Sequence, residues 1–272
     1  MTAVLTASDI SVVDARGRNL LEPVSFRLEP GRPLVVLGET GSGKSLLSQA
    51  IIGTLPEGLT ASGRICLGDA VFSASQPQTF RSLWGRAVAL LPQEPWLSLD
   101  PLMRVQPQVA ETHRLVRGLG GRAATEAAQT DLAALGLAGA QRRYPHQLSG
   151  GMAQRAAFAA ARAGGARILL ADEPTKGLDA ARRDEVAGLL LREVAAGGSL
   201  LVITHDLALA QRLGTRCSSS ATVSWSSGAA PRPSWRHPAA TMAGVSWRPT
   251  RGAGPRRRQL RQRRRRCSRP GT

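Results

Sequence analysis

Short apolar runs recur along the first three quarters of the chain and alternate with segments of helical composition. Residues 34–37 (LVVL), 88–91 (VALL), 168–171 (ILLA) and 200–203 (LLVI) are continuous apolar runs, the pattern of strands covered on both faces. Residues 24–28 alternate apolar and polar side chains, as a half-exposed strand does. Buried strands that alternate with helical stretches predict an α/β fold with a mainly parallel sheet.

One long segment departs from this alternation. Between about residues 102 and 163 the strand-like runs vanish, Leu, Ala, Arg and Glu dominate, and glycines at 118–121 and 136–139 interrupt the pattern. More than sixty residues is long for a single crossover connection. We therefore expect a helical subdomain inserted in the α/β body, with ordinary crossover helices as the alternative.

The last 58 residues have a different composition from the rest of the chain. Residues 215–272 contain 14 Arg and no acidic residue, whereas residues 1–214 contain 22 basic and 19 acidic residues. The net charge of +17 therefore comes mainly from this tail, and it does not indicate a nucleic-acid partner for the body. We expect an ordered domain over 1–214 and a disordered tail over 215–272.

Two origins of this tail stay open. The first is a frameshift near Thr215, which would explain the Arg-, Ser- and Pro-rich composition without acidic residues. The second is a functional segment whose Arg and Trp residues bind nucleic acid or an anionic membrane. The absence of a periodic pattern favours the first.

Several classes of protein are not expected from the composition. The three cysteines, Cys66, Cys217 and Cys267, form no CxxC pair, which favours a reducing compartment. No apolar run approaches the ~18 residues that a membrane span needs. The N-terminus lacks the basic start and long apolar stretch of a secretory signal.

The strongest chemical signal is a glycine-rich motif, Gly38-x4-Gly43-Lys44-Ser45. Glycines let backbone N–H groups surround phosphate oxygens, and the start of the following helix favours an anion. In such a motif Lys44 can reach the β- and γ-phosphates, and the Ser45 hydroxyl can bind Mg²⁺. A chance Gly-rich turn is the alternative, but the motif lies between a predicted strand and residues 46–54 of helical composition. Lys44 and Lys176 are the only lysines in the chain, which suggests positions where Arg will not serve.

Two acidic residues end the apolar run at 168–171. Successive side chains of a strand point to opposite faces, so Asp172 and Glu173 can have different tasks. Asp172 is suited to the Mg²⁺ shell, and Glu173 to orienting and deprotonating an attacking water. By itself, an acidic strand end is a solvated surface feature as often as it is a catalytic site. The glycine-rich motif in the same chain makes the catalytic interpretation the better one.

A third motif, Ser149-Gly150-Gly151, precedes an Ala-rich helical segment. A Ser followed by two glycines at a helix start can bind phosphate through its hydroxyl and its backbone N–H groups. A plain helix N-cap is the alternative, and it is the better interpretation of the tripeptide by itself.

These motifs, in this order, resemble those of the ABC-transporter nucleotide-binding domain. Residues 38–45 are similar to its Walker A motif, residues 168–173 to its Walker B motif, and residues 148–155 (LSGGMAQR) to its signature. Gln93, in LPQEP, matches the Q-loop position, residues 177–179 the D-loop, and His205, in ITHD, the switch histidine. The resemblance covers about residues 1–213.

The resemblance implies an ABC-type P-loop NTPase fold with antiparallel N-terminal strands, and a Mg²⁺-dependent ATPase that pairs with an identical or sibling subunit. Each ATP would lie between the Walker residues of one subunit and the signature loop of the other. The implied catalytic residues are Glu173, His205, Lys44 and Gln93, and the implied metal residues are Ser45, Gln93 and Asp172. The implied ATP-binding residues are Gly38, Glu39, Thr40, Gly41, Ser42, Gly43, Lys44, Ser45, Leu46, Ser149, Gly150, Gly151 and Asp179.

A narrower resemblance concerns residues 93–101 (QEPWLSLDP) and 144–152 (YPHQLSGGM). They are similar to stretches of the ATP-binding subunits of dipeptide, oligopeptide and nickel importers. This implies an energy-coupling subunit on the cytoplasmic face of the plasma (inner) membrane, with transmembrane permease subunits and an extracytoplasmic solute-binding protein as partners. Two alternatives stay open. The first is a soluble ABC ATPase that acts on nucleic acid or ribosomes. The second is a defective relic that binds nucleotide weakly, because residues 10–17 contain no aromatic residue to stack on adenine and the C-terminal end does not match the family.

Overall fold

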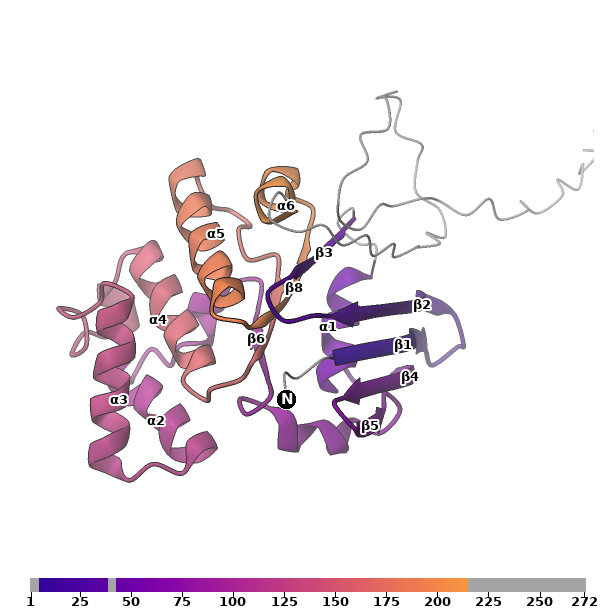
Figure 1. Ribbon diagram of the computed structural model, residues 1–272, viewed down its shortest axis with the longest axis horizontal. Coiled ribbons are helices and arrows are strands. Elements are labelled where there is room, and N and C mark those ends of the chain that lie inside the picture. Colours follow the sequence, from indigo (N-terminus) through magenta and orange to yellow (C-terminus); the bar gives the residue numbers. More distant parts are fainter. Residues whose placement is uncertain (1–4, 39–42, 215–272) are drawn as a thin grey trace, which may run out of the picture.

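Two four-stranded sheets organise the part of the chain that the computed structural model describes, residues 5–38 and 43–214 (Figure 1). One sheet is antiparallel and built from N-terminal strands, and the other is parallel. The predicted α/β fold with a parallel core sheet and antiparallel N-terminal strands is therefore confirmed. The prediction of a disordered tail at 215–272 lies outside the described residues.

The antiparallel sheet has the strand order β2-β1-β4-β5 and turns an apolar face inward. In β2, Leu21, Val24, Phe26 and Leu28 are buried while the residues between them are more exposed, as the alternation over 24–28 predicts. The buried face packs against α1 (Lys44–Ile52). The strands of this sheet are β1 (Leu5–Asp14), β2 (Asn19–Leu28), β4 (Leu59–Leu67) and β5 (Ala70–Ser73).

The parallel sheet has the strand order β3-β8-β7-β6. Every residue of its two inner strands, β7 and β8, is buried, because helices or strands cover both faces of the sheet. The four continuous apolar runs of the sequence correspond to the four strands, and the carboxyl ends of all four meet at one edge. The strands are β3 (Pro33–Leu37), β6 (Val88–Leu91), β7 (Ile168–Asp172) and β8 (Ser199–Thr204).

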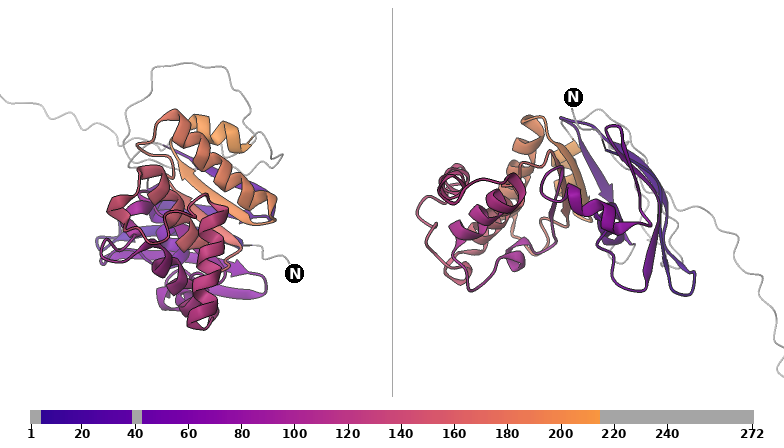
Figure 2. Two further views of the ribbon diagram at one scale, coloured as in Figure 1. Left: turned by 90° about the vertical axis from the view of Figure 1, so that its left-hand side faces the viewer. Right: turned by 90° about the horizontal axis from the view of Figure 1, so that it is seen from below.

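The two faces of the parallel sheet are covered by different elements. Ile168 and Leu170 of β7 belong to a cluster with α1 and the antiparallel sheet. Leu169 and Ala171 belong to a second cluster, with α5 (Ala180–Ala195) and α6 (Leu207–Gly214). Figure 2 shows the resulting layers, with α1 between the two sheets. Continuous apolar runs, rather than alternating ones, follow from this two-sided burial.

Three helices, two of them Ala-rich, pack together at one end of the molecule (Figure 1). They occupy the stretch from about 102 to 163 in which the sequence predicts helices. The buried His113 ring joins two of them, because its Nε2 lies 2.8 Å from Asp131 Oδ2. No helix within the described ranges is long and apolar enough to cross a bilayer. The three helices are α2 (Val105–Arg117), α3 (Gly121–Ala134) and α4 (Gly150–Arg162), and short 3₁₀ helices are η1 (Pro77–Leu83), η2 (Pro95–Ser98) and η3 (Pro145–Gln147).

The inner strand β7 provides a direct test of this layered core. Leu170 is fully buried in β7, whereas Leu115 of α2 is 68% exposed. Leu170→Ala should lower the free energy of unfolding by about 2–5 kcal/mol, because it removes buried methyl groups and leaves a cavity. Leu115→Ala should change it by less than about 0.5 kcal/mol. Equal losses for the two variants in denaturant titrations would contradict the assigned core.

Candidate active site

A polar cavity of about 290 Å³ lies where the parallel strands end. Its walls come from the start of α1 and from the residues that follow β6, β7 and β8. Sequence reasoning assigned seven of its eight lining residues to the site, and the eighth is Lys176. The lining residues are Gly43, Lys44, Ser45, Leu46, Gln93, Glu173, Lys176 and His205.

The start of α1 shapes one wall of this cavity. Gly43 precedes the helix with a φ of 82°, and a Cβ at this position would lie 2.6 Å from the carbonyl oxygen of Leu20. Only glycine fits there without strain. The first N–H groups of a helix have no partner within it and attract an anion, and the buried Lys44 ammonium adds a positive charge. Of the predicted phosphate loop, Glu39, Thr40, Gly41 and Ser42 lie outside the described residues, and Gly38 is held by its N–H bond to the Thr204 carbonyl (3.3 Å).

Asp172 is the last residue of β7, is 8% exposed, and is not among the residues that line the cavity. Its Oδ2 accepts a hydrogen bond from the Ser48 hydroxyl (3.4 Å), whereas its buried Oδ1 has no hydrogen-bond partner among the described residues. Burial raises the pKa of the Asp172 carboxyl above 3.8, and the charge of Glu173 raises it further. Hydrogen bonds from Ser45 and Ser48 and the charge of Lys44 oppose this rise.

These features of Asp172 fit a divalent cation. The Asp172 carboxylate, which has one unpartnered oxygen and a hydrogen bond from Ser45, offers with the Ser45 hydroxyl the oxygen ligands that Mg²⁺ prefers. Within residues 5–38 and 43–214 no group of three His, Cys, Asp or Glu side chains could hold a metal alone. Mg²⁺ is commonly bound through one or two carboxylates together with substrate phosphates, so the donor set suits Mg²⁺ bound with a nucleotide.

Glu173 is held in a strained backbone conformation next to Asp172. Its φ is 46°, which is uncommon for a residue other than glycine, and its N–H donates to the Ile203 carbonyl at 2.7 Å. The carboxylate is buried, and both of its oxygens lie 2.8 Å from Nδ1 of His205. Strain of this kind persists only where neighbouring contacts maintain it, and here those contacts come from the end of β8.

Thr204 is a residue of the site that sequence reasoning missed. It is fully buried, and its hydroxyl donates to Glu173 Oε2 at 3.2 Å. The Thr204 Oγ1 also accepts a hydrogen bond from the Asp206 N–H at 3.0 Å. Its position directly before His205 is the feature of the sequence that could have identified it. This buried hydrogen bond to Glu173 holds the Glu173 carboxylate in one orientation.

Five of the predicted ATP-binding residues that the structure describes do not line the cavity: Gly38, at the end of β3, and four residues at the starts of α4 and α5. Ser149 caps α4 by accepting the Met152 N–H (3.3 Å), and Asp179 caps α5 by accepting the Arg182 N–H (2.9 Å). Ser149, Gly150 and Asp179 are exposed, and Gly151 is partly exposed. Within the described part of this single chain, the signature loop and the cavity are therefore separate.

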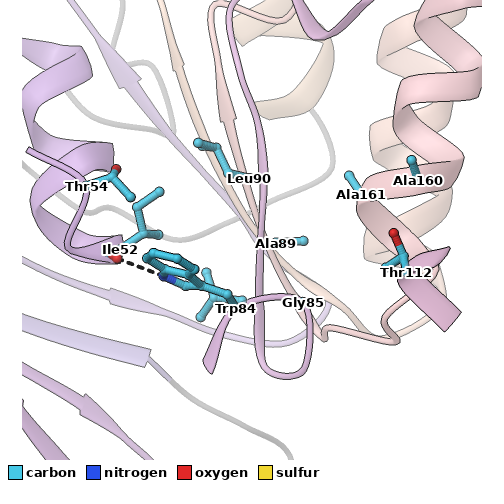
Figure 3. A pocket seen from close by; sticks show the side chains of 10 residues that line it. Ile52, Thr54, Trp84, Gly85, Ala89, Leu90, Thr112, Ala160 and Ala161 are labelled. Carbon is cyan, nitrogen blue, oxygen red and sulfur yellow. Dashed lines mark hydrogen bonds between the residues drawn. The ribbon is translucent and has the colours of Figure 1, made fainter. Parts of the chain in front are cut away.

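A second cavity, of about 270 Å³, lies between the end of α1, the residues around β6, and helices α2 and α4 (Figure 3). Its described lining is mostly apolar and contains no charged side chain. The indole Nε1 of Trp84 donates to the Ile52 carbonyl at 2.9 Å. This cavity offers no group for phosphate chemistry, so the polar cavity is the candidate active site.

The polar cavity combines an anion-attracting helix start, the buried Lys44 side chain and the positioned Glu173 carboxylate, and the Asp172 carboxylate lies next to Glu173 in sequence at the end of β7. This arrangement is suited to phosphoryl transfer, which depends on positioning and on stabilising charge. Together with the parallel sheet, it defines the class of the protein as a P-loop NTPase.

Comparisons with known proteins agree with this class. Residues 21–176 match the family described as ABC transporter. The peptidoglycan transport ATP-binding protein YejF of Agrobacterium fabrum is 32% identical over 222 residues, which cover 78% of this chain and 41% of that protein. The oligopeptide transport ATP-binding protein OppD of Mycobacterium tuberculosis is 32% identical over 225 residues, which cover 79% and 37%. The uncharacterized ABC transporter ATP-binding protein YejF of Escherichia coli is 36% identical over 208 residues, which cover 73% and 39%.

The family match covers more than half of the chain, and the chain belongs to the ABC transporter family. It spans about two fifths of the length of the three relatives named above. The resemblance based on the Walker and signature motifs is thereby confirmed at the level of the family.

The raised pKa of Asp172 predicts how the stability of the nucleotide-free protein depends on pH. Between 3.8 and the raised pKa, the native state binds more protons than the unfolded state, so stability falls as pH rises through this window. Asp172→Asn keeps the shape and removes this titration. The variant should therefore be more stable than the unmodified chain near neutral pH, and the gain should vanish below pH 3.8.

Thermal unfolding without nucleotide or Mg²⁺, followed across pH, measures this effect. Asp69→Asn, at an exposed position, is the control and should show no pH-dependent gain. An Asp172→Asn variant that is less stable than the unmodified chain near neutral pH would contradict the assigned cause.

Proposed function

We propose that this chain hydrolyses MgATP as the energy-coupling subunit of an ABC importer for peptides. The observation that carries the proposal is the Glu173 carboxylate, fixed by Thr204 and His205 in a cavity that also contains Lys44. The relative named for oligopeptide transport supports the peptide cargo. Nickel, which the narrower sequence resemblance also includes, stays a prediction.

Most residues of the cavity, together with Asp172 at the end of β7, have a proposed role in hydrolysis. The start of α1 and Lys44 bind the β- and γ-phosphates, with Gly38 to Leu46 forming the phosphate-binding segment. Glu173 orients the attacking water and accepts its proton, and His205 contacts the γ-phosphate. Ser45, Asp172 and Gln93 hold Mg²⁺, which when bound neutralises charge on the phosphate oxygens.

The exposed signature loop supports a composite site. Ser149, Gly150 and Gly151 begin α4 and do not line the cavity of their own chain. We propose that they and Asp179 contact the ATP held by a second ABC subunit, identical or sibling. The helix start at Ser149 would then bring its N–H groups to the γ-phosphate of the partner's nucleotide.

The remaining parts of the proposal concern organisation and partners. Residues 1–214 form the ATPase domain, with the helical subdomain at about 102–163. The subunit binds transmembrane permease subunits on the cytoplasmic face of the plasma (inner) membrane, and an extracytoplasmic solute-binding protein delivers the cargo. Gln93, which follows β6 and lines the cavity, transmits the nucleotide state to the permease.

The role of Glu173 can be tested by replacing its carboxylate alone. Glu173→Gln should lower the rate of MgATP hydrolysis by about 10²–10⁴-fold, because the amide cannot accept the proton of the water. ATP binding should persist, whereas Lys44→Ala should weaken it. Steady-state hydrolysis and equilibrium binding of the purified full chain measure the two effects.

Glu126→Gln is the matched control for this experiment. Glu126 lies on α3, its side chain is 62% exposed, and it pairs with Arg122. The control should hydrolyse ATP at the rate of the unmodified chain. Full turnover by Glu173→Gln would remove Glu173 as the base.

The Thr204 hydroxyl should affect turnover more than substrate affinity. Thr204→Val removes the hydrogen bond to Glu173 Oε2 and should lower kcat by about tenfold, the effect of losing about 1.4 kcal/mol of stabilisation. Thr204→Ser keeps the hydroxyl and should retain most of the activity. An unchanged kcat in Thr204→Val would show that the carboxylate does not depend on this contact.

A further inference from the structure

The cavity contains a second ammonium group that the proposed mechanism does not use. Only two of the 36 basic residues of the chain are lysines, Lys44 and Lys176, and both line this cavity. All other basic residues are arginines. A lysine differs from an arginine in carrying a compact point charge on a flexible stem. Because lysine is used only at these two positions, the composition indicates that the cavity requires a compact positive charge at both of them.

The backbone that carries Lys176 is anchored next to Glu173. The Lys176 N–H donates to the Glu173 carbonyl at 3.1 Å, which closes a turn between the two residues. The buried Thr175 hydroxyl donates to Asp206 Oδ2 at 3.1 Å, and Gln154 Nε2 donates to the Pro174 carbonyl at 3.0 Å. These contacts fix the base of the Lys176 side chain, so its stem starts from a defined position beside the proposed general base.

The charge of Lys176 is available to a ligand. Lys176 is exposed, and among the described residues its ammonium forms no ion pair with a carboxylate. The neighbouring Glu173 carboxylate is instead engaged by His205 and Thr204. A lysine that lines an anion-binding cavity without a carboxylate partner is suited to contact an anionic group that enters the cavity.

We propose that the Lys176 ammonium, which lines the cavity together with Lys44, binds the terminal phosphate of ATP. The inference rests on the proposed function. Lys44 begins α1 after β3, whereas Lys176 follows β7 three residues after Glu173. Because Glu173 must lie near the phosphorus that water attacks, an ammonium one turn away is placed for the γ-phosphate rather than for the α-phosphate or the base. The contact therefore distinguishes ATP from ADP.

The test compares the binding of two nucleotides to the full-length chain. Lys176→Met should weaken binding of a non-hydrolysable ATP analogue with Mg²⁺ by about tenfold, because it removes a charge-assisted hydrogen bond. Binding of ADP with Mg²⁺ should not change. Titration calorimetry of both nucleotides measures the two dissociation constants.

Arg122→Met is the control, because it removes one positive charge from a side chain that is 94% exposed on α3. It should leave both dissociation constants unchanged. Equal weakening of both nucleotides by Lys176→Met, or no weakening of either, would overturn the role of Lys176 while leaving the proposed function intact. Failure of the unmodified chain to bind either nucleotide would overturn both.

Discussion

The parallel pairing of β3, β8 and β7 is the constraint on which the rest of the structure depends. In this register Leu37 lies beside Thr204, and Asp172 beside Ile203. Residues that are far apart in sequence therefore leave the sheet at one edge. The start of α1, the two carboxylates and His205 converge because their strands end together, which is the general position of ligand sites in open α/β sheets.

The fold could be predicted where burial leaves a continuous trace in the sequence. The four strands of the parallel sheet are buried on both faces, so each appears as an uninterrupted apolar run. The individual bounds of β1, β4 and β5 were not assigned from the sequence. Their polar and apolar residues are mixed, since only one face of the antiparallel sheet is covered and Gly63 interrupts β4 with a φ of 109°.

The candidate site could be predicted where the chemistry lies within one short motif. Lys44, Asp172 and Glu173 belong to such motifs, and all three lie at the edge of the sheet where the cavity is found. Thr204 was missed, because its role arises from contact with Glu173, 31 residues earlier in the chain. In the sequence, Lys176 is notable only as one of two lysines. Its proposed role could be inferred only from the structure, because the sequence pattern does not show that it lines the cavity.

The separation of the signature loop from the cavity has a physical meaning within this account. Ser149 and Asp179 each accept a backbone N–H with one side-chain oxygen and so cap a helix. The helix starts that they cap are exposed at the surface. A site completed by a second subunit needs such pre-formed surfaces, because ordering them during each cycle would cost free energy. In the proposed composite site, the cavity with the tightly held Glu173 comes from one subunit and the exposed signature loop comes from the other.

The central claim is that the cavity at the carboxyl ends of the parallel strands binds a nucleoside triphosphate. A crystal structure of the full chain with Mg²⁺ and a non-hydrolysable ATP analogue tests it most directly. The account predicts the phosphates at the start of α1, against Lys44, with the metal at Asp172 and the terminal phosphate facing Glu173 and His205. Phosphates bound elsewhere on the chain, or none in the cavity at saturating nucleotide, would contradict it.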